Sequence, residues 1–379
     1  MGIDKIIMII MMIFFTLGAI DRCIGNKFQL GKEYERGWGI LAPTALVVLG
    51  LMSIAPVVAI IIRPVIVPIY TFLGADPAMF SGTFFSPDCG GYSIGADLAN
   101  DPEIAAFGGF VVGATIGAVV SFTIPFAYGL IDKEDTKYFS VGIMSGFIFD
   151  PVACFIGGLV MGLKPIVILQ NLVPVIISAL AIVVGLYFIP RILIKVFKYF
   201  SNFLLIIITI GLVNGAIEQM TGFAIIQGTR PISEAFIILS NIILVIAGAL
   251  PFLHVFRKIF NKPINRISEK MGITELTLAT MILSLTSIAP LYTEYGKFNI
   301  KGKVIAAGFT ASMSNMFGAH LGFISAIDST YIGPMIVAKC VAGAFAIPTA
   351  IFFYNRLFGK KSNNYSPENA EIQVPESNN

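Results

Sequence analysis

Charged residues are scarce in this chain, and that scarcity excludes a water-soluble fold. Only 12% of the 379 residues are Asp, Glu, Lys or Arg, whereas 56% are hydrophobic. A soluble globular protein carries roughly twice that charged fraction. The formal net charge of +3 is small, so it gives no reason to expect nucleic acid as a partner.

Residues that ligate metals or form disulfides are also few. The chain has only two histidines, His254 and His320. Cysteines in apolar segments are usually inert, reduced thiols. We therefore expect no metal site and no cofactor. The four cysteines, which lack the spacing of a metal site, are Cys23, Cys89, Cys154 and Cys340.

Long apolar runs make up most of the chain. Segments of about 20 residues, each long enough to cross a bilayer, recur along almost its whole length. The first run lacks a small-residue cleavage motif, so we expect a transmembrane helix there and no cleavable signal. We predict an all-α, multi-pass protein of the cytoplasmic membrane with about 10–11 transmembrane segments, at residues 4–20, 38–62, 64–74, 104–131, 138–163, 166–190, 199–219, 233–256, 273–291, 303–327 and 331–357.

Glycine and proline interrupt the apolar pattern between residues 64 and 100. The piece 64–74 is too short to cross a membrane alone, and several glycines and Pro87 follow it. We interpret 64–100 as a broken or re-entrant element. Irregular backbone at membrane depth survives only inside protein or beside a wet cavity. This stretch is therefore predicted to lie at a cavity.

Three short motifs recur in the same order in both halves of the chain. A duplicated structure explains this order better than chance does, because single matches of this length are weak. The motif pairs are SIAP at 53–56 and 287–290, GYSIGAD at 91–97 with GFISAID at 322–328, and FTIPFA at 122–127 with FAIPTA at 345–350.

The repeats define the expected domain organisation. We predict a single membrane transport domain over 1–358, with repeat 1 at about 1–130, an inserted middle at 131–230 and repeat 2 at about 231–358. Paired units with interrupted helices are typical of transporters whose site lies where the interruptions meet. The polar segment 359–379 is predicted to be a disordered tail.

Basic loops give the expected topology. Loop 21–37 has four Lys or Arg residues and loop 257–270 has five, so both are expected on the cytoplasmic side. These loops are repeat equivalents, which favours parallel units. Known transporters favour inverted units, so the orientation stays open.

Asp88 is the first candidate for substrate binding. A charged side chain at the membrane centre costs about 2.5–3.5 kcal/mol on insertion scales, and its default interpretation is functional. The neighbouring Gly90 and Gly91 would let a substrate approach the backbone closely. The alternative is that Asp88 caps a short helix, since Asp is a preferred N-cap.

Further candidates lie near Asp88 or at the matching position of the second half. There Ala319 aligns with Asp88, and His320 follows it. His320 could accept from or donate to a polar ligand, or it could be a core histidine bonded to a carbonyl. Asn315 could hydrogen-bond a ligand. Tyr92 and Phe323 could enclose a cation, although aromatic residues in membrane chains usually face the core or lipid.

Second-rank candidates are three acids and one aromatic residue. Asp97 and Asp328 are repeat equivalents that we expect to cap matching helices. Asp150 precedes Pro151 within a predicted span, and Asp-Pro commonly begins a new helical piece. Phe84 lies beside the Asp88 stretch and could contribute to a cation–π site.

An enzyme is the main alternative of a different class. Gly91 to Gly95 match the G-x-S-x-G signature of serine hydrolases, which requires a strand, turn and helix that the sequence does not predict. An intramembrane serine hydrolase would need a pair such as Ser93 with His320. We expect no enzyme. A non-transporting membrane sensor is a further alternative.

Five segments carry a resemblance to a known family. MGIDKIIMIIMMIFF, PVIVPIYTFLGADPAMFSGTF, DCGGYSIGADLA, GIMSGFIFDPVACFIGGLV and GAHLGF occur in that order. Together they resemble the EutH family, the ethanolamine permease of ethanolamine-utilisation operons, over most of residues 1–358. The family pattern often has an acidic residue before the histidine, where this chain has Ala319. The negative charge of the site is therefore expected to come from Asp88.

The resemblance implies uptake of ethanolamine across the cytoplasmic membrane, feeding a cytosolic ammonia-lyase. A carboxylate, a hydroxyl partner and aromatic walls would suit this cationic amino alcohol. Another small cation or an amino acid is the alternative substrate. Proton coupling through Asp88 and His320, and assembly as a homo-oligomer, are both compatible with the sequence.

Overall fold

The computed structural model describes residues 2–259 and 261–358. Within these two ranges the chain forms helices and turns and contains no strand, which confirms the predicted all-α class. The tail predicted to be disordered, 359–379, lies outside the described residues.

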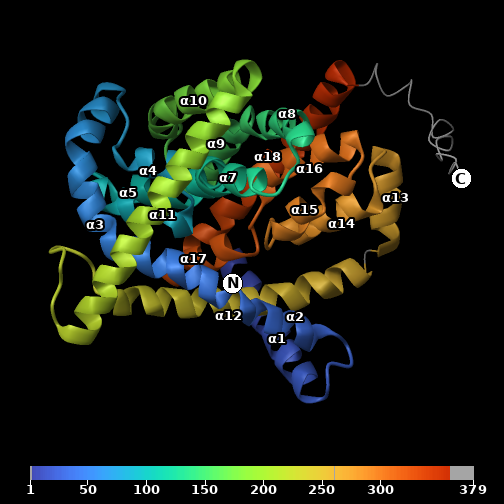
Figure 1. Cartoon of the computed structure of the whole chain (residues 1–379), viewed down its shortest axis with the longest axis horizontal. Helices are drawn as coiled ribbons and strands as arrows, with labels where there is room; N and C mark the ends of the chain where they lie inside the picture. Colours follow the sequence, from blue (N-terminus) through green and yellow to red (C-terminus); the bar gives the residue numbers. More distant parts are fainter. Residues whose placement is uncertain (1, 260, 359–379) are drawn as a thin grey trace, which may run out of the picture.

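Seven helices in this part of the chain are long and apolar enough to cross a membrane, and a pair bent by 41° makes an eighth candidate (Figure 1). The protein is therefore a multi-pass membrane protein. The long helices are α1 (Ile3–Cys23), α3 (Leu41–Phe72), α8 (Thr136–Phe147) with α9 (Asp150–Val160), α10 (Pro165–Phe188), α11 (Pro190–Thr221), α12 (Ile232–Ile259) and α18 (Ile332–Leu357).

The bent pair is made partly of π-helix. It consists of α6 (Pro102–Ala106), η2 (Phe107–Gly117), η3 (Val119–Thr123) and α7 (Ile124–Tyr128).

Shorter elements connect the long spans or interrupt them. The other short elements are α2 (Leu30–Gly39), α4 (Ala78–Phe84), η1 (Pro87–Cys89), α5 (Ser93–Leu98), η4 (Lys133–Asp135), α13 (Asn261–Met271), α14 (Glu275–Ser284), α15 (Ala289–Thr293), η5 (Tyr295–Lys297), α16 (Ile300–Met313), α17 (Ala319–Ile327) and η6 (Ser329–Tyr331).

The number of long spans is lower than the 10–11 expected, for two reasons. The predicted segments 38–62 and 64–74 form one continuous helix, α3, which runs through three prolines. Membrane helices tolerate proline when neighbouring groups satisfy the freed backbone. Conversely, the segments predicted at 273–291 and 303–327 are each broken into two shorter helices.

The broken element predicted at 64–100 is present only in its later part, 75–100, where α4, η1 and α5 follow one another, because 64–72 continues α3. The Asp76 carboxylate ties its two ends together. It accepts hydrogen bonds from the backbone N–H groups of Ala78 at 2.8 Å, Asn100 at 3.0 Å and Asp101 at 3.1 Å. Short helices that cannot span the membrane are thus held as one compact unit.

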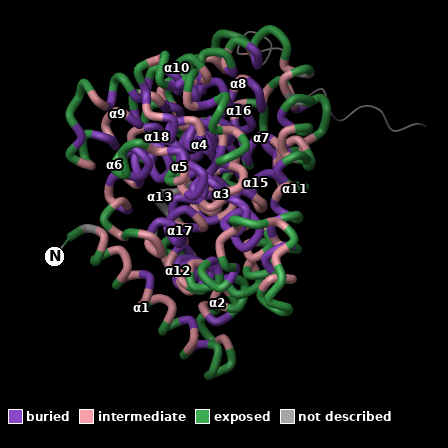
Figure 2. Tube along the Cα trace, turned by 90° about the vertical axis from the view of Figure 1, so that its left-hand side faces the viewer, coloured by how far each residue is buried: buried purple, intermediate pink, exposed green. Residues whose placement is uncertain are grey.

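Glycines of η2 allow this unit to sit close to its neighbour. A Cβ atom at Gly109 would lie 2.6 Å from the Cα of Tyr92, and one at Gly117 would lie 2.2 Å from the carbonyl oxygen of Phe85. Small residues commonly permit such close approach between membrane helices. Figure 2 shows α4 and α5 among the buried parts of the chain, with α1 and α2 at a more exposed edge.

The two basic loops lie next to each other. Lys27 and Gln29 of the first loop, with Arg257 and Lys258 of the second, line one surface hollow. This is the arrangement expected of loops on the same side of the membrane. The internal duplication, the domain boundaries and the orientation of the repeats stay predictions.

Candidate functional site

A cavity of about 340 Å³ lies where three breaks in the helices meet. The breaks are residues 85–92 between α4 and α5, 285–288 between α14 and α15, and 314–318 between α16 and α17. The polar and thiol side chains that line the cavity come from all of these breaks, from the start of α17 and from α3. They are Thr44, Ser86, Asp88, Cys89, Thr286, Ser287, Asn315 and His320.

Two of the breaks satisfy each other's backbone groups. The N–H of Asn315 donates to the carbonyl of Ser284 at 2.9 Å, and the N–H of Phe317 donates to Leu285 at 2.8 Å. Asn315 has a φ of 56°, a left-handed conformation that asparagine adopts more readily than most residues. Irregular backbone within a membrane protein is stable when it is paired in this way.

Asp88 lies in the short turn η1 and is anchored through two serines. Its Oδ1 accepts a hydrogen bond from Ser86 Oγ at 2.7 Å. The Ser86 N–H donates to Ser121 Oγ at 3.0 Å, which fixes the turn against η3. The N-cap positions of η1 and α5 are occupied by Ser86 and Tyr92, so the helix-cap alternative for Asp88 is wrong.

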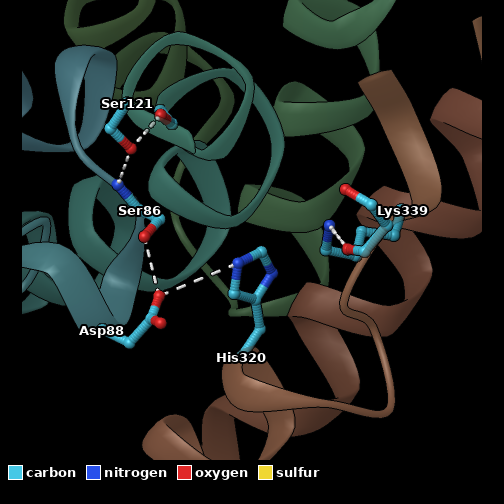
Figure 3. A network of polar contacts seen from close by, with 7 residues as sticks. Ser86, Asp88, Ser121, His320 and Lys339 are labelled. Atoms are coloured by element: carbon cyan, nitrogen blue, oxygen red, sulfur yellow. Dashed lines mark hydrogen bonds and ion pairs between the residues drawn. The ribbon is translucent and has the colours of Figure 1, made fainter. Parts of the chain in front are cut away.

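His320 faces Asp88 from the other half of the chain. Its Nε2 lies 3.9 Å from Asp88 Oδ1, which is too far for a direct hydrogen bond. Its Nδ1 is buried and has no hydrogen-bond partner among the described residues, where the alternative of a core histidine bonded to a carbonyl is therefore not realised. A ligand group about 2.8 Å from both residues could bridge them. In the view of Figure 3, the imidazole ring lies between the Asp88 carboxylate and the Lys339 side chain.

Seven residues were predicted as the main candidates for substrate binding. Three of them, Asp88, Asn315 and His320, line this cavity. The other four are absent from its lining. Tyr92 stacks on Phe110 with the ring centroids 4.2 Å apart, and Phe323 is fully buried in the core. A binding role for these aromatic residues stays a prediction.

Gly90 and Gly91, two of these seven candidates, determine the backbone conformation of the break at 85–92. A Cβ atom at Gly91 would lie 2.7 Å from the carbonyl oxygen of Phe85, and Gly90 has a φ of 96°. Both features favour glycine for reasons of backbone packing and conformation. Contact of either glycine with a substrate stays a prediction.

The second-rank residues lie outside the cavity lining. Asp150 begins α9, as its Asp-Pro sequence predicts. Asp328 accepts a hydrogen bond from the Thr330 N–H at 2.9 Å and so caps η6. The capping prediction is wrong for Asp97, which lies inside α5 and pairs with Arg230. Phe84 packs against Phe80 with the ring centroids 5.2 Å apart.

Sequence reasoning missed Lys339, which lies within α18 and is fully buried. Its Nζ donates to the Ser314 carbonyl at 2.8 Å, directly before Asn315. A lysine inside an apolar transmembrane segment is a signal of function that the sequence already contained. Thr286 was also missed. It lines the cavity, and within 2–259 and 261–358 its buried Oγ1 has no hydrogen-bond partner.

This arrangement suits a small polar cation. Asp88 offers a carboxylate, while Thr286 Oγ1 and His320 Nδ1 are hydrogen-bonding atoms without partners in the part of the chain that the structure describes. Buried polar groups are rarely left unpaired without a functional reason. The hydrolase alternative finds little support, because Ser93 begins α5 and is not in the lining, whereas His320 faces Asp88.

Comparisons with known proteins agree with this picture. The family model described as "Ethanolamine utilisation protein, EutH" matches residues 3–353. The "Probable ethanolamine permease EutH" of Listeria monocytogenes serotype 1/2a (strain 10403S) is 43% identical over 360 residues, which cover 95% of this chain and 96% of that protein. The protein of the same name from Salmonella typhimurium is 32% identical, covering 93% and 95%. "Uncharacterized protein YxeR" of Bacillus subtilis (strain 168) is 33% identical, covering 92% and 95%. No solved structure is significantly similar.

Proposed function

Since the chain belongs to the EutH family of ethanolamine utilisation proteins, we propose that it carries ethanolamine across the cytoplasmic membrane. The single observation behind this proposal is the Asp88 carboxylate in a cavity formed by three helix breaks. Breaks of this kind are where transporters bind their substrates. The names of the relatives support ethanolamine as that substrate.

In the proposed complex, Asp88 accepts hydrogen bonds from the ammonium group of ethanolamine. The hydroxyl group of the substrate meets Thr286 or Asn315, which line the same cavity. His320 Nε2 lies close enough to Asp88 to help position the ammonium group or the hydroxyl group. A hydrogen bond to a charged group contributes about 1.5–3 kcal/mol, so Asp88 provides the largest single contact.

Transport of the cation explains why a carrier is useful. A primary amine titrates near pH 10, so on the order of 0.1% of ethanolamine is neutral at pH 7. Only this neutral fraction crosses lipid unaided, and it falls tenfold for each pH unit downward. A carrier for the cation therefore matters most at low substrate concentration and low pH.

The membrane potential supplies enough energy for uptake of such a cation. It contributes about 2.3 kcal/mol per charge per 100 mV, which corresponds to roughly 50-fold accumulation. A co-transported ion is therefore not required. We propose facilitated uptake of ethanolammonium, with proton coupling through Asp88 and His320 as the mechanism to be tested against it.

Uptake of labelled ethanolamine into proteoliposomes tests the proposal. The vesicles carry an inside-negative potential and no pH gradient. Saturable uptake that follows the potential is expected. Uptake that needs an added proton gradient would replace the facilitator by a proton-coupled carrier. Absence of uptake under both conditions, in protein shown to be folded, would overturn the proposal. Competition by other amines and by amino acids tests the choice of substrate.

A further inference from the structure

A second hollow, of about 690 Å³, lies where α8, α16 and the end of α18 meet the turn after α13. Its volume is in the range of about 300–1,000 Å³ that is usual for ligand sites. Figure 1 shows α8, α16 and the end of α18 on the same side of the molecule as α13. Ten described residues line this hollow, and none of them is acidic. None of them lines the cavity that contains Asp88.

Two lysines give the hollow its charge. Lys137 Nζ lies 4.7 Å from the centroid of the Tyr138 ring, and a Cβ atom at Gly272 would lie 3.3 Å from Lys301 Nζ. Tyr138 and Gly272 both line the hollow, so both ammonium groups lie at its wall. Among the described residues neither lysine forms an ion pair. The hollow therefore attracts a negatively charged ligand.

The position of these lysines in their helices supports an anionic ligand. Lys137 is the second residue of α8, and Lys301 is the second residue of α16. The dipole of a helix disfavours a positive charge in its first turn and favours a negative one. An anion between the two ammonium groups compensates this unfavourable placement in both helices at once.

Apolar and aromatic side chains form much of the remaining wall. Ile300 and Leu357 are 39% and 43% exposed, although both are large and apolar. Tyr138 and Tyr354 pack against Phe358, with ring centroids 5.0 and 6.5 Å apart. Tyrosine is enriched where membrane helices reach the water interface. The hollow thus offers lysines to a charged group and apolar surface to hydrocarbon, which are the two parts of a phospholipid.

The basic loops place this hollow on the side that is expected to be cytoplasmic. Gly272 directly follows α13, and Glu275 and Leu276 line the surface hollow that the two basic loops share. Loops rich in Lys and Arg lie in the cytoplasm. The cytoplasmic leaflet has a negative surface potential, and basic pockets between membrane helices on that side bind anionic headgroups.

We infer that this hollow binds an anionic phospholipid of the cytoplasmic leaflet. The ammonium groups of Lys137 and Lys301 hold the phosphate, and the acyl chains lie along Ile300 and Leu357. A lipid bound in this way touches α8, α16 and α18 together. The inference does not depend on which substrate the protein carries, or on whether it carries one.

Binding of phosphatidylglycerol to the delipidated, detergent-purified protein tests the inference, with native mass spectrometry to count bound lipids. We expect the protein to bind phosphatidylglycerol more tightly than phosphatidylcholine, whose headgroup has no net charge. Each lysine should contribute about 5-fold, so Lys137→Gln combined with Lys301→Gln should lower the affinity for phosphatidylglycerol about 30-fold. The affinity for phosphatidylcholine should stay the same. Equal affinities of wild type and the double variant for phosphatidylglycerol would overturn the inference.

A matched lysine variant separates a site from general attraction to a basic surface. Lys133→Gln removes an exposed lysine of η4 that does not line the hollow, and it should bind phosphatidylglycerol like wild type. A loss as large as that of the double variant would contradict a specific site. Melting temperatures without lipid should be equal for all variants, since the three lysines form no ion pair among the described residues.

Two further measurements identify the occupant of the hollow. Glycerol 1-phosphate carries the phosphate without acyl chains, and it should not displace phosphatidylglycerol. Displacement would show a soluble phosphate ligand and would exclude the lipid. The segment after Phe358 contains Glu368, Glu371 and Glu376. Changing all three to Gln in the full chain should leave lipid binding unchanged, whereas tighter binding would show that this segment itself occupies the hollow.

Discussion

His320 Nε2 lies 3.9 Å from Asp88 Oδ1 across a cavity bordered by broken helices. Asp88 belongs to the break before α5, and His320 lies in the first turn of α17. The two residues meet only because both breaks are formed and face each other (Figure 3). A movement of one broken element against the other would change this distance first. In the proposed transporter, this distance is therefore a direct measure of such a movement at the proposed binding site.

The charge of Asp88 is the first feature to test. Asp88→Asn keeps the size of the side chain, and we expect saturable ethanolamine uptake to fall about 10- to 100-fold through loss of a charged hydrogen bond. Uptake is measured in proteoliposomes that contain equal amounts of folded protein. Asp328→Asn is the matched control, because asparagine also caps a helix and uptake should stay unchanged. Normal uptake by Asp88→Asn would remove Asp88 from the site.

The two nitrogen atoms of His320 can be tested separately. A glutamine amide reaches the position of Nε2, which faces Asp88. An asparagine amide reaches that of Nδ1, which has no partner among the residues described. We expect His320→Gln to retain about 2- to 10-fold more uptake than His320→Asn, the effect of one ordinary hydrogen bond. Initial rates over a range of ethanolamine concentrations measure the difference. The reverse order would show that Nδ1 is the atom that contacts the substrate.

Cys89 provides a chemical probe of the cavity. It lines the cavity beside Asp88, whereas Cys154 is fully buried and lies 3.1 Å from Thr115 Oγ1. In a variant that keeps only Cys89, we expect a positively charged methanethiosulfonate to react and ethanolamine to slow that reaction as it fills the site. A variant that keeps only Cys154 should not react. Labelling of Cys89 that saturating ethanolamine leaves unchanged would place the substrate elsewhere.

A buried ion pair away from the cavity tests how much stability this protein loses when such a pair is broken. Lys303 Nζ lies 2.6 Å from Asp135 Oδ1 and joins α16 to η4. Lys303→Met leaves the carboxylate buried and unpaired, so we expect a loss of about 3–5 kcal/mol in stability. Lys297→Met, at the exposed pair with Glu294, should cost about 0–1 kcal/mol.

Unfolding in detergent compares these two variants, and the double variant Lys303→Met with Asp135→Asn should recover part of the loss. Equal stability of the two single variants would mean that the Lys303 pair is hydrated in solution.

Much of the fold and part of the site followed from the sequence, because the signals were local. Apolar runs predicted helices, and glycine and proline predicted a broken element at 64–100, of which 75–100 is broken in the structure. Asp88, Asn315 and His320 were selected as polar residues in interrupted membrane segments, and the structure brings them to one cavity. A polar group at membrane depth is informative without any knowledge of its neighbours.

The errors came from features that depend on tertiary contacts. The segments 38–62 and 64–74 were predicted to be separate, yet α3 continues through Pro64, since surrounding helices can satisfy a freed backbone group. Asp97 looked like a cap, and its partner Arg230 lies far away in the sequence. Lys339 was different, because a lysine inside an apolar span was visible in the sequence and was overlooked, and the structure adds only its contact with the Ser314 carbonyl.

The contact between two breaks predicts that Gly318 cannot be replaced. A Cβ atom there would lie 2.1 Å from the carbonyl oxygen of Thr286, which belongs to the facing break and lines the cavity. Gly318→Ala must therefore separate the two breaks, and we expect both thermal stability and saturable uptake to fall. Gly333→Ala is the matched control in α18, where a Cβ atom meets nothing within 4 Å. Alanine stabilises an exposed helix by up to about 1 kcal/mol over glycine, so this control should be at least as stable as wild type. If Gly318→Ala matched Gly333→Ala in both measurements, the two breaks would not be in contact during transport, and the cavity would have to be built without Thr286.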